Sequence, residues 1–147
     1  MISQAQAEDI LARYKRYDRA AERFDKRRHS RGGGWTEAEQ AEIARMAGGS
    51  LPSNEELGEL EFFNFMTQRP ETIFAYYEGD ARVGQEIRTW PGQKIGVVVW
   101  RGTETRPMGG RSVSIRMQGL NGFLYAGRCN LSSGSYCRLR KMSGRTR

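Results

Sequence analysis

The chain has 147 residues, of which 37% are hydrophobic, and a net charge of +7. This length is enough for one domain, or for a small domain with an appendage. The longest apolar run, IGVVVW, is too short to cross a bilayer, and the N-terminal segment has charges where a signal peptide needs an apolar core. We therefore expect a cytoplasmic protein, without a membrane partner, whose two cysteines are reduced thiols.

The charge is unevenly distributed along the chain. Residues 1–31 hold nine Lys or Arg and five Asp or Glu, residues 32–78 hold two and nine, and residues 79–147 hold thirteen and three. A basic segment with few acids suits a polyanionic partner, most often nucleic acid. The alternative is that the acidic and basic parts face each other or face a partner protein.

Residues 3–28 are predicted to form a helix. Apolar side chains that recur every three or four residues would share one of its faces: Ile10, Tyr14, Tyr17, Ala21 and Phe24. This stripe packs either on the rest of the chain or on a second copy, which would give a homodimer through the N-terminal helix.

The run KRRHSRGGG at residues 26–34 is expected to end the helix, because glycines leave the backbone mobile, and to serve as a linker. Its cations are a candidate secondary basic patch: Lys26, Arg27, Arg28 and Arg31.

Two further helices are predicted before residue 70. TEAE from Thr36 and SNEE from Ser53 are capping boxes, and Gly48-Gly49 is a plausible left-handed stop. Pro70 bounds the last helix, because the residue before a proline avoids the helical region. The buried side of that helix is expected to contain Leu57, Leu60, Phe63 and either Met66 or Phe65.

The periodicity changes to that of strands after Pro70. The predicted strands are TIFAYYEG, QEIRTW, IGVVVWRG, SVSIRMQG, FLYAGRC and SYCRLRKM, with turns at PGQK and at Asn121-Gly122. We predict an α+β protein in which N-terminal helices precede a small SH3-like barrel of five or six antiparallel strands. Its parts are a basic helix and linker (1–31), an acidic helical segment (32–70) and a small basic β-barrel (71–147).

Alternation along four strands assigns side chains to two faces of the barrel. The predicted inner set is Ile87, Thr89, Ile95, Val97, Val99, Val113, Ile115, Met117, Cys137 and Leu139. The predicted outer set is Arg88, Trp90, Val98, Trp100, Ser114, Arg116, Tyr136, Arg138 and Arg140.

The outer set mixes aromatic rings, which stack on bases, with arginines, which pair with phosphates. With the following lysine, it supplies a candidate nucleic-acid or partner-binding site: Arg88, Trp90, Trp100, Arg116, Tyr136, Arg138, Arg140 and Lys141. The alternative is that the helical region covers Trp90 and Trp100 in a second core with Phe62 or Phe65, while arginine stems lie over the rings.

Residues suited to catalysis are scarce. The one histidine, His29, is in the charged linker, so a serine or cysteine nucleophile lacks a structured base. Cys129 and Cys137 flank the loop of CNLSSGSYC and can lie close together, but with one histidine they cannot complete a zinc site. We expect buried thiols there, and no catalytic residue, metal or cofactor in this chain.

Residues 53–141 resemble small uncharacterised phage and prophage proteins. The matching features are a short acidic helix that ends in Arg69-Pro70, a Thr-Trp-x-Gly-x-x-Ile-Gly hairpin from Thr89, and an Asn-Gly-x-x-Tyr-x-Gly segment from Asn121. The resemblance implies an accessory protein that acts by stoichiometric binding, as an anti-CRISPR protein does when it covers a nucleoprotein surface.

We therefore predict a non-enzymatic phage-type accessory protein that binds and inhibits or modulates a host nucleoprotein complex in the host cytoplasm. The alternative is a direct DNA- or RNA-binding protein of phage replication, transcription or packaging. Salt-dependent binding to generic nucleic acid would favour the alternative, because phosphate contacts release counterions.

Overall fold

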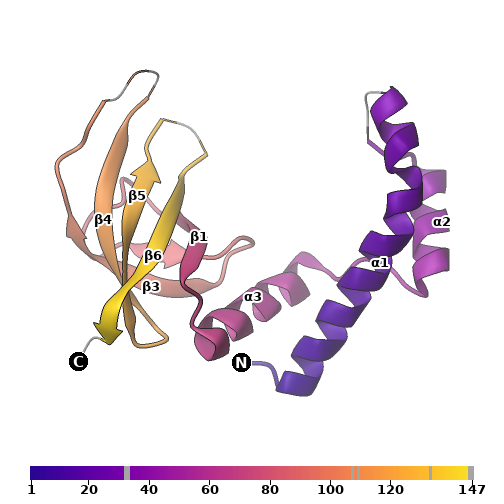
Figure 1. The fold of residues 1–147 in the computed structure, drawn as a ribbon, viewed down its shortest axis with the longest axis horizontal. Coiled ribbons are helices and arrows are strands. Elements are labelled where there is room, and N and C mark those ends of the chain that lie inside the picture. The colour runs from indigo at the N-terminus through magenta and orange to yellow at the C-terminus, as the bar shows by residue number, and fades with distance from the viewer. Residues whose placement is uncertain (32–33, 107, 109, 133, 146–147) are drawn as a thin grey trace. The chain divides into compact units, whose positions relative to one another are not determined.

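The computed structural model describes residues 1–31, 34–106, 108, 110–132 and 134–145, without the side chains of 25–31 and 143–145. Within these residues, three helices precede six strands (Figure 1). The helices are α1 (Gln4–Arg31), α2 (Glu37–Ala47) and α3 (Asn54–Gln68). The strands are β1 (Thr72–Tyr77), β2 (Glu86–Arg88), β3 (Lys94–Arg101), β4 (Ser112–Gly119), β5 (Phe123–Asn130) and β6 (Tyr136–Arg145). The chain forms two compact units, Ile2–Leu60 and Glu61–Arg147, with the boundary inside α3.

In the helical unit, α1 packs against α2. The shared core consists of Ala20, Ala21, Phe24, Ile43 and Ala47, with Tyr17, Trp35 and Met46 at its edge. The predicted apolar stripe therefore packs within the chain at its C-terminal end, whereas Tyr14 is exposed.

α1 ends at Arg31, inside the run expected to end it, so KRRHSR belongs to the helix and the predicted bound at residue 28 is three residues short. None of these six residues is a glycine or proline, so each has an adequate helix propensity. The two leading glycines of the expected linker, residues 32 and 33, lie outside the described residues.

Both predicted capping boxes are present. Glu39 N donates to Thr36 Oγ1 at 3.2 Å, and Thr36 N donates to Glu39 Oε1 at 3.0 Å. The same reciprocal pair joins Ser53 and Glu56, with both distances 3.1 Å. Gly48, with a φ of 74°, ends α2 in the left-handed conformation as predicted.

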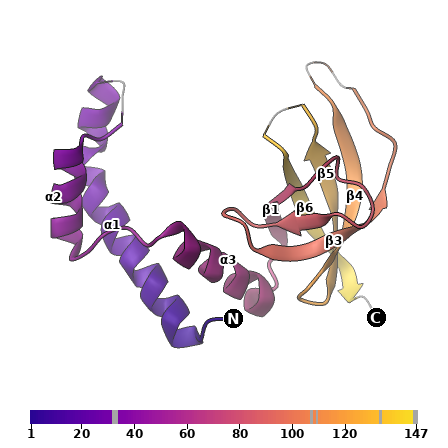
Figure 2. The ribbon, with the colours of Figure 1, turned by 180° about the vertical axis from the view of Figure 1, so that it is seen from behind.

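The strands form a closed antiparallel barrel in which each strand pairs with the next and β6 pairs with β1. Figure 2 shows the closed wall of strands from behind. The predicted fold class, α+β with N-terminal helices and a small barrel, is confirmed. Gly122 has the positive φ of 91° expected in the turn between β4 and β5, but Asn121 does not adopt a positive φ, so the turn is not the predicted primed type.

The barrel core confirms the predicted inner faces of β2, β4 and β6 and corrects that of β3. Val98, predicted to point outward, is buried, whereas Val97 is half-buried and Val99 is exposed. The pairing of β3 shifts register opposite Ile87/Arg88 and again between Val98 and Trp100. Each irregularity interrupts the period of two on which the prediction depends.

Tyr125 is the largest fully buried side chain of the barrel and ties it to the end of α3. Its hydroxyl donates to the carbonyl oxygen of Pro70 at 2.8 Å. The amide of Asn121 donates to that hydroxyl at 3.2 Å and to the carbonyl oxygen of Phe65 at 3.0 Å. The Asn-Gly-x-x-Tyr segment therefore has a structural use, because its polar atoms satisfy the backbone where α3 meets the strands.

Candidate nucleic-acid interface

The outer side of β1, β6, β5, β4 and β3 carries aromatic rings and arginines in adjacent cross-strand rows. One row runs from Trp100 through Arg116, Ala126 and Arg140 to Thr72. The next includes Arg128, Arg138 and Phe74, and a third pairs Tyr136 with Tyr76. We call this surface the cationic face: Phe74, Tyr76, Trp100, Arg116, Arg128, Tyr136, Arg138 and Arg140.

The aromatic members of the cationic face are open to solvent. Phe74 is 67% exposed, and Trp100 and Tyr136 are each 44% exposed. Large apolar rings are rarely left uncovered in this number on the outside of a small unit without an interaction that uses them. Figure 1 labels the strands that carry them, β1, β3 and β6, in the barrel.

The arginines of the cationic face keep their charge uncompensated. Among the described residues of the barrel unit, Arg116, Arg128, Arg138 and Arg140 form no ion pair, while five acids pair with other cations: Glu71, Glu78, Asp80, Glu86 and Glu104. Glu104, for example, pairs with Arg101, Arg106 and Arg111 rather than with any arginine of the face. The face is therefore a surface of net positive charge.

Neutral groups hold several of these guanidinium groups in place. Arg128 Nη1 donates to Ser112 Oγ at 2.8 Å and to Thr105 Oγ1 at 3.1 Å. The Arg116 guanidinium lies 5.1 Å from the centre of the Trp100 ring, and that of Arg138 lies 5.9 Å from the centre of the Phe74 ring. Such contacts orient the cation without cancelling its charge.

Two predicted site residues are neutralised by the chain's own acids. Arg88 Nε pairs with Glu78 Oε1 at 2.8 Å, and its Nη2 pairs with Glu86. Lys141 Nζ lies 3.6 Å from Glu71 Oε2, donates to the carbonyl oxygen of Arg69 at 3.1 Å and lies over the ring of Phe123. We therefore leave Arg88 and Lys141 out of the cationic face.

Trp90 and Trp100 are not covered in a second core. Trp90 is 59% exposed and lies beyond the end of β2, before a cis bond to Pro91, so it is outside the strand rows of the cationic face. Trp100 belongs to the face. The alternative reading of the sequence expected arginine stems over the tryptophan rings, and Arg116 does lie over Trp100. It also expected Phe62 or Phe65 to cover the tryptophans, and the core of the described residues does not include that contact.

The structure adds three residues that the sequence analysis did not select: Phe74, Tyr76 and Arg128. Phe74 lies between the inward Ile73 and Ala75, and Arg128 precedes the inward Cys129. The period-two alternation of β1 and β5 therefore predicts that both side chains point outward. The predicted secondary patch of Lys26, Arg27, Arg28 and Arg31 lies on the last turns of α1, where the structure describes the backbone and not the side chains.

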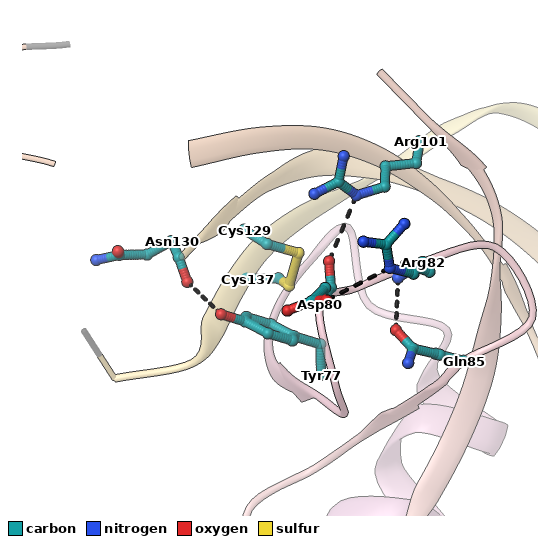
Figure 3. The surroundings of a disulfide bond; sticks show 8 residues. All are labelled: Tyr77, Asp80, Arg82, Gln85, Arg101, Cys129, Asn130 and Cys137. Atoms are coloured by element: carbon teal, nitrogen blue, oxygen red, sulfur yellow. Dashed lines mark hydrogen bonds and ion pairs between the residues drawn. A yellow bond between two sulfur atoms is a disulfide. The ribbon is translucent and has the colours of Figure 1, made fainter. Parts of the chain in front are cut away.

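Cys129 and Cys137 form a disulfide, so the expectation of two reduced thiols is corrected. They are directly opposite each other in the pairing of β5 with β6, and both are fully buried. Figure 3 shows the bond beside Tyr77, whose hydroxyl donates to the carbonyl oxygen of Asn130 at 2.8 Å. The bond therefore joins the strands that carry Arg128 and Arg138.

None of the described helices combines the length and the apolar character needed to span a membrane. Comparisons with family models, curated proteins and solved structures gave no significant match. The resemblance to phage proteins therefore stays a prediction, and the function has to be argued from the cationic face.

Proposed function

We propose that this protein is a non-enzymatic protein that binds single-stranded nucleic acid on the cationic face. The observation that supports this most directly is the combination of exposed rings with arginines that have no acidic partner in the described structure. Phosphates of any nucleic acid would pair with the arginines. Rings stack only on bases that are not already stacked in a duplex, which favours a single strand.

The resemblance to phage proteins predicts that the target nucleic acid belongs to a host nucleoprotein complex, which this protein would inhibit or modulate. This remains a prediction, as does a homodimer through α1. Cytoplasmic location also remains a prediction. A nucleic-acid target agrees with it, whereas a buried disulfide is more typical of oxidising compartments.

The proposal is tested by the double variant Arg138→Gln/Arg140→Gln, which removes two charges from the cationic face. We expect the affinity for a labelled single-stranded oligonucleotide to fall at least tenfold, because each charge-assisted hydrogen bond contributes about 1.5–3 kcal/mol. Fluorescence anisotropy at fixed salt measures this. Both side chains are exposed, so the fold should not change.

The matched control is Arg82→Gln/Arg106→Gln, which removes two exposed charges elsewhere in the same unit. The affinity of this control variant for the oligonucleotide should stay within about twofold of the affinity of the parent protein. Surface charges away from the contacts act only through the screened electrostatic field. Equal losses in both double variants would show that net charge alone drives binding and would refute the assignment to the cationic face.

A further inference from the structure

The cationic face contains a hollow of about 410 Å³ over β1, β4, β5 and β6. Its lining includes two rings and three arginines, together with a hydroxyl that already orients one of them: Phe74, Tyr136, Arg111, Arg128, Arg138 and Ser112. This volume is within the range of about 300–1,000 Å³ that is usual for small-molecule sites.

Two arginines of the hollow lie directly opposite each other. Arg128 and Arg138 are Cα partners in the pairing of β5 with β6. Like charges at opposite positions of an antiparallel pair destabilise a sheet. Since neither forms an ion pair among the described residues, their charges would be satisfied best by an external anion.

The charge of the hollow indicates which anion fits. Arg111 pairs with Glu104, which Arg101 and Arg106 share, and the hydrogen bond from Arg111 lowers the pKa of the Glu104 carboxyl, so the charge of Arg111 is partly neutralised. Arg128 and Arg138 remain, with two positive charges. A phosphomonoester carries about −1.5 to −2 near neutral pH, whereas an internal phosphodiester carries a single negative charge.

The aromatic residues add an apolar wall beside these cations. Phe74 is the cross-strand neighbour of Arg138, and Tyr136 precedes Arg138 by two positions on the same face of β6. Both rings are exposed. A base stacked on such a ring would lie within one nucleotide of a phosphate held by the arginine pair.

We propose that the hollow is a binding site for a nucleotide that carries a phosphomonoester, with its phosphate on Arg128 and Arg138 and its base against Phe74 and Tyr136. This inference rests on the proposed function and names the ligand of that same face. The shared chemistry has two sources: a free mononucleotide, or the phosphorylated end of a single strand.

The test measures binding of adenosine 5′-monophosphate, adenosine and inorganic phosphate to the full chain by isothermal titration calorimetry. We expect the monophosphate to bind with a Kd below about 1 mM and at least tenfold more tightly than either fragment, because only it engages both the ring and the arginine pair. Absence of monophosphate binding would overturn the inference. If the oligonucleotide still bound, the proposed function would stand without it.

The source of the nucleotide is distinguished with one oligonucleotide in three forms: with a 5′-phosphate, with a 3′-phosphate and with two hydroxyl ends. A strand end as the ligand predicts at least fivefold tighter binding of one phosphorylated form. Equal binding of the three forms, with the monophosphate bound, identifies the free mononucleotide. If the protein bound the monophosphate and no oligonucleotide, the proposed function would be refuted, while the assignment of the hollow as a nucleotide site would stand.

Variants separate the hollow from the rest of the face. Arg128→Gln and Phe74→Leu should each weaken monophosphate binding at least fivefold. Arg116→Gln removes a charge of the face that does not line the hollow, and it should weaken oligonucleotide binding while leaving monophosphate binding within twofold. If Arg116→Gln weakened the monophosphate as much as Arg128→Gln, the anion would be held by the general field and the site would be refuted.

Discussion

At the scale of single residues, Gly127 allows β5 and β6 to approach each other beside the arginine pair. A Cβ at this position would lie 1.9 Å from the carbonyl oxygen of Arg138. This atom belongs to the backbone, so it can yield only if β6 moves. Gly127 therefore sets the spacing of the strands that present Arg128 and Arg138.

We predict that Gly127→Ala lowers the free energy of unfolding by about 1–3 kcal/mol, as overpacking usually does. Denaturant unfolding followed by tryptophan fluorescence measures this change. The control is Gly34→Ala, where a Cβ meets no atom within 4 Å and the loss should be small. An unchanged Gly127→Ala protein would mean that the strands can separate freely at this point.

Glu56 supports the helical unit in its ionised form. Its hydrogen bond from Arg13, followed by that from the Ser53 backbone, lowers the pKa of the carboxyl to about 2 from an ordinary value of 4.5. Because the folded-state pKa is depressed, the stabilisation is complete above about pH 4.5 and is lost as the pH falls towards 2.

We expect Glu56→Gln to lower the unfolding temperature of the helical unit at pH 7, and the difference from the parent to disappear by about pH 2. Circular dichroism melts across this range test the expectation. Glu55→Gln, on the exposed side of the same turn, is the charge-matched control. A difference between Glu56→Gln and the parent that persisted unchanged at low pH would show that charge is not the cause.

At the scale of elements, the pair β5–β6 is joined by both the sheet ladder and the disulfide. The bond closes a loop with a sequence separation of eight residues. In the chain-entropy view, a loop of this length stabilises a fold by about 2–3 kcal/mol.

Reduction of the disulfide should therefore lower the free energy of unfolding of the barrel by about 2–3 kcal/mol, measured by denaturant unfolding with and without a phosphine reductant. Alkylation in denaturant without reductant, followed by mass spectrometry, checks whether the two cysteines are bonded to each other. No added alkyl group is expected on either cysteine. Two added groups would mean that the thiols are free, as the cytoplasmic expectation implies.

At the scale of the whole molecule, the net charge of +7 predicts attraction to nucleic acid but not where it binds. Acids of the barrel unit pair with Arg82, Arg88, Lys94, Arg101, Arg106, Arg111 and Lys141. Among the described residues of the barrel unit, Arg116, Arg128, Arg138 and Arg140 on the cationic face have no acidic partner.

Four arginines that each contact one phosphate predict a slope of about −3 for the logarithm of the binding constant against that of the salt concentration. Each Arg→Gln substitution on the face should reduce the slope by about 0.7 for a single strand. Anisotropy titrations at several salt concentrations measure both values. A slope near zero would exclude phosphate contacts as the main source of affinity.

The order and type of the elements were predictable from the sequence alone. Capping boxes at Thr36 and Ser53, the stop at Gly48, and alternation in SVSIRMQG and SYCRLRKM are local patterns, and local backbone preference is enough to predict them. The outward positions of Arg116, Arg138 and Arg140 follow from the same alternation, as do those of Trp100 and Tyr136, so five of the eight residues of the cationic face were predictable from the sequence.

Only the tertiary structure decided which cations stay available. The pairs of Arg88 with Glu78 and of Lys141 with Glu71 join chain segments that the sequence does not show to be adjacent. The same holds for the disulfide, for the two register shifts of β3, and for the juxtaposition of Arg128 with Arg138 and Phe74. Strand register is a property of pairs of strands, set by packing between distant segments, whereas alternation is a property of one strand by itself.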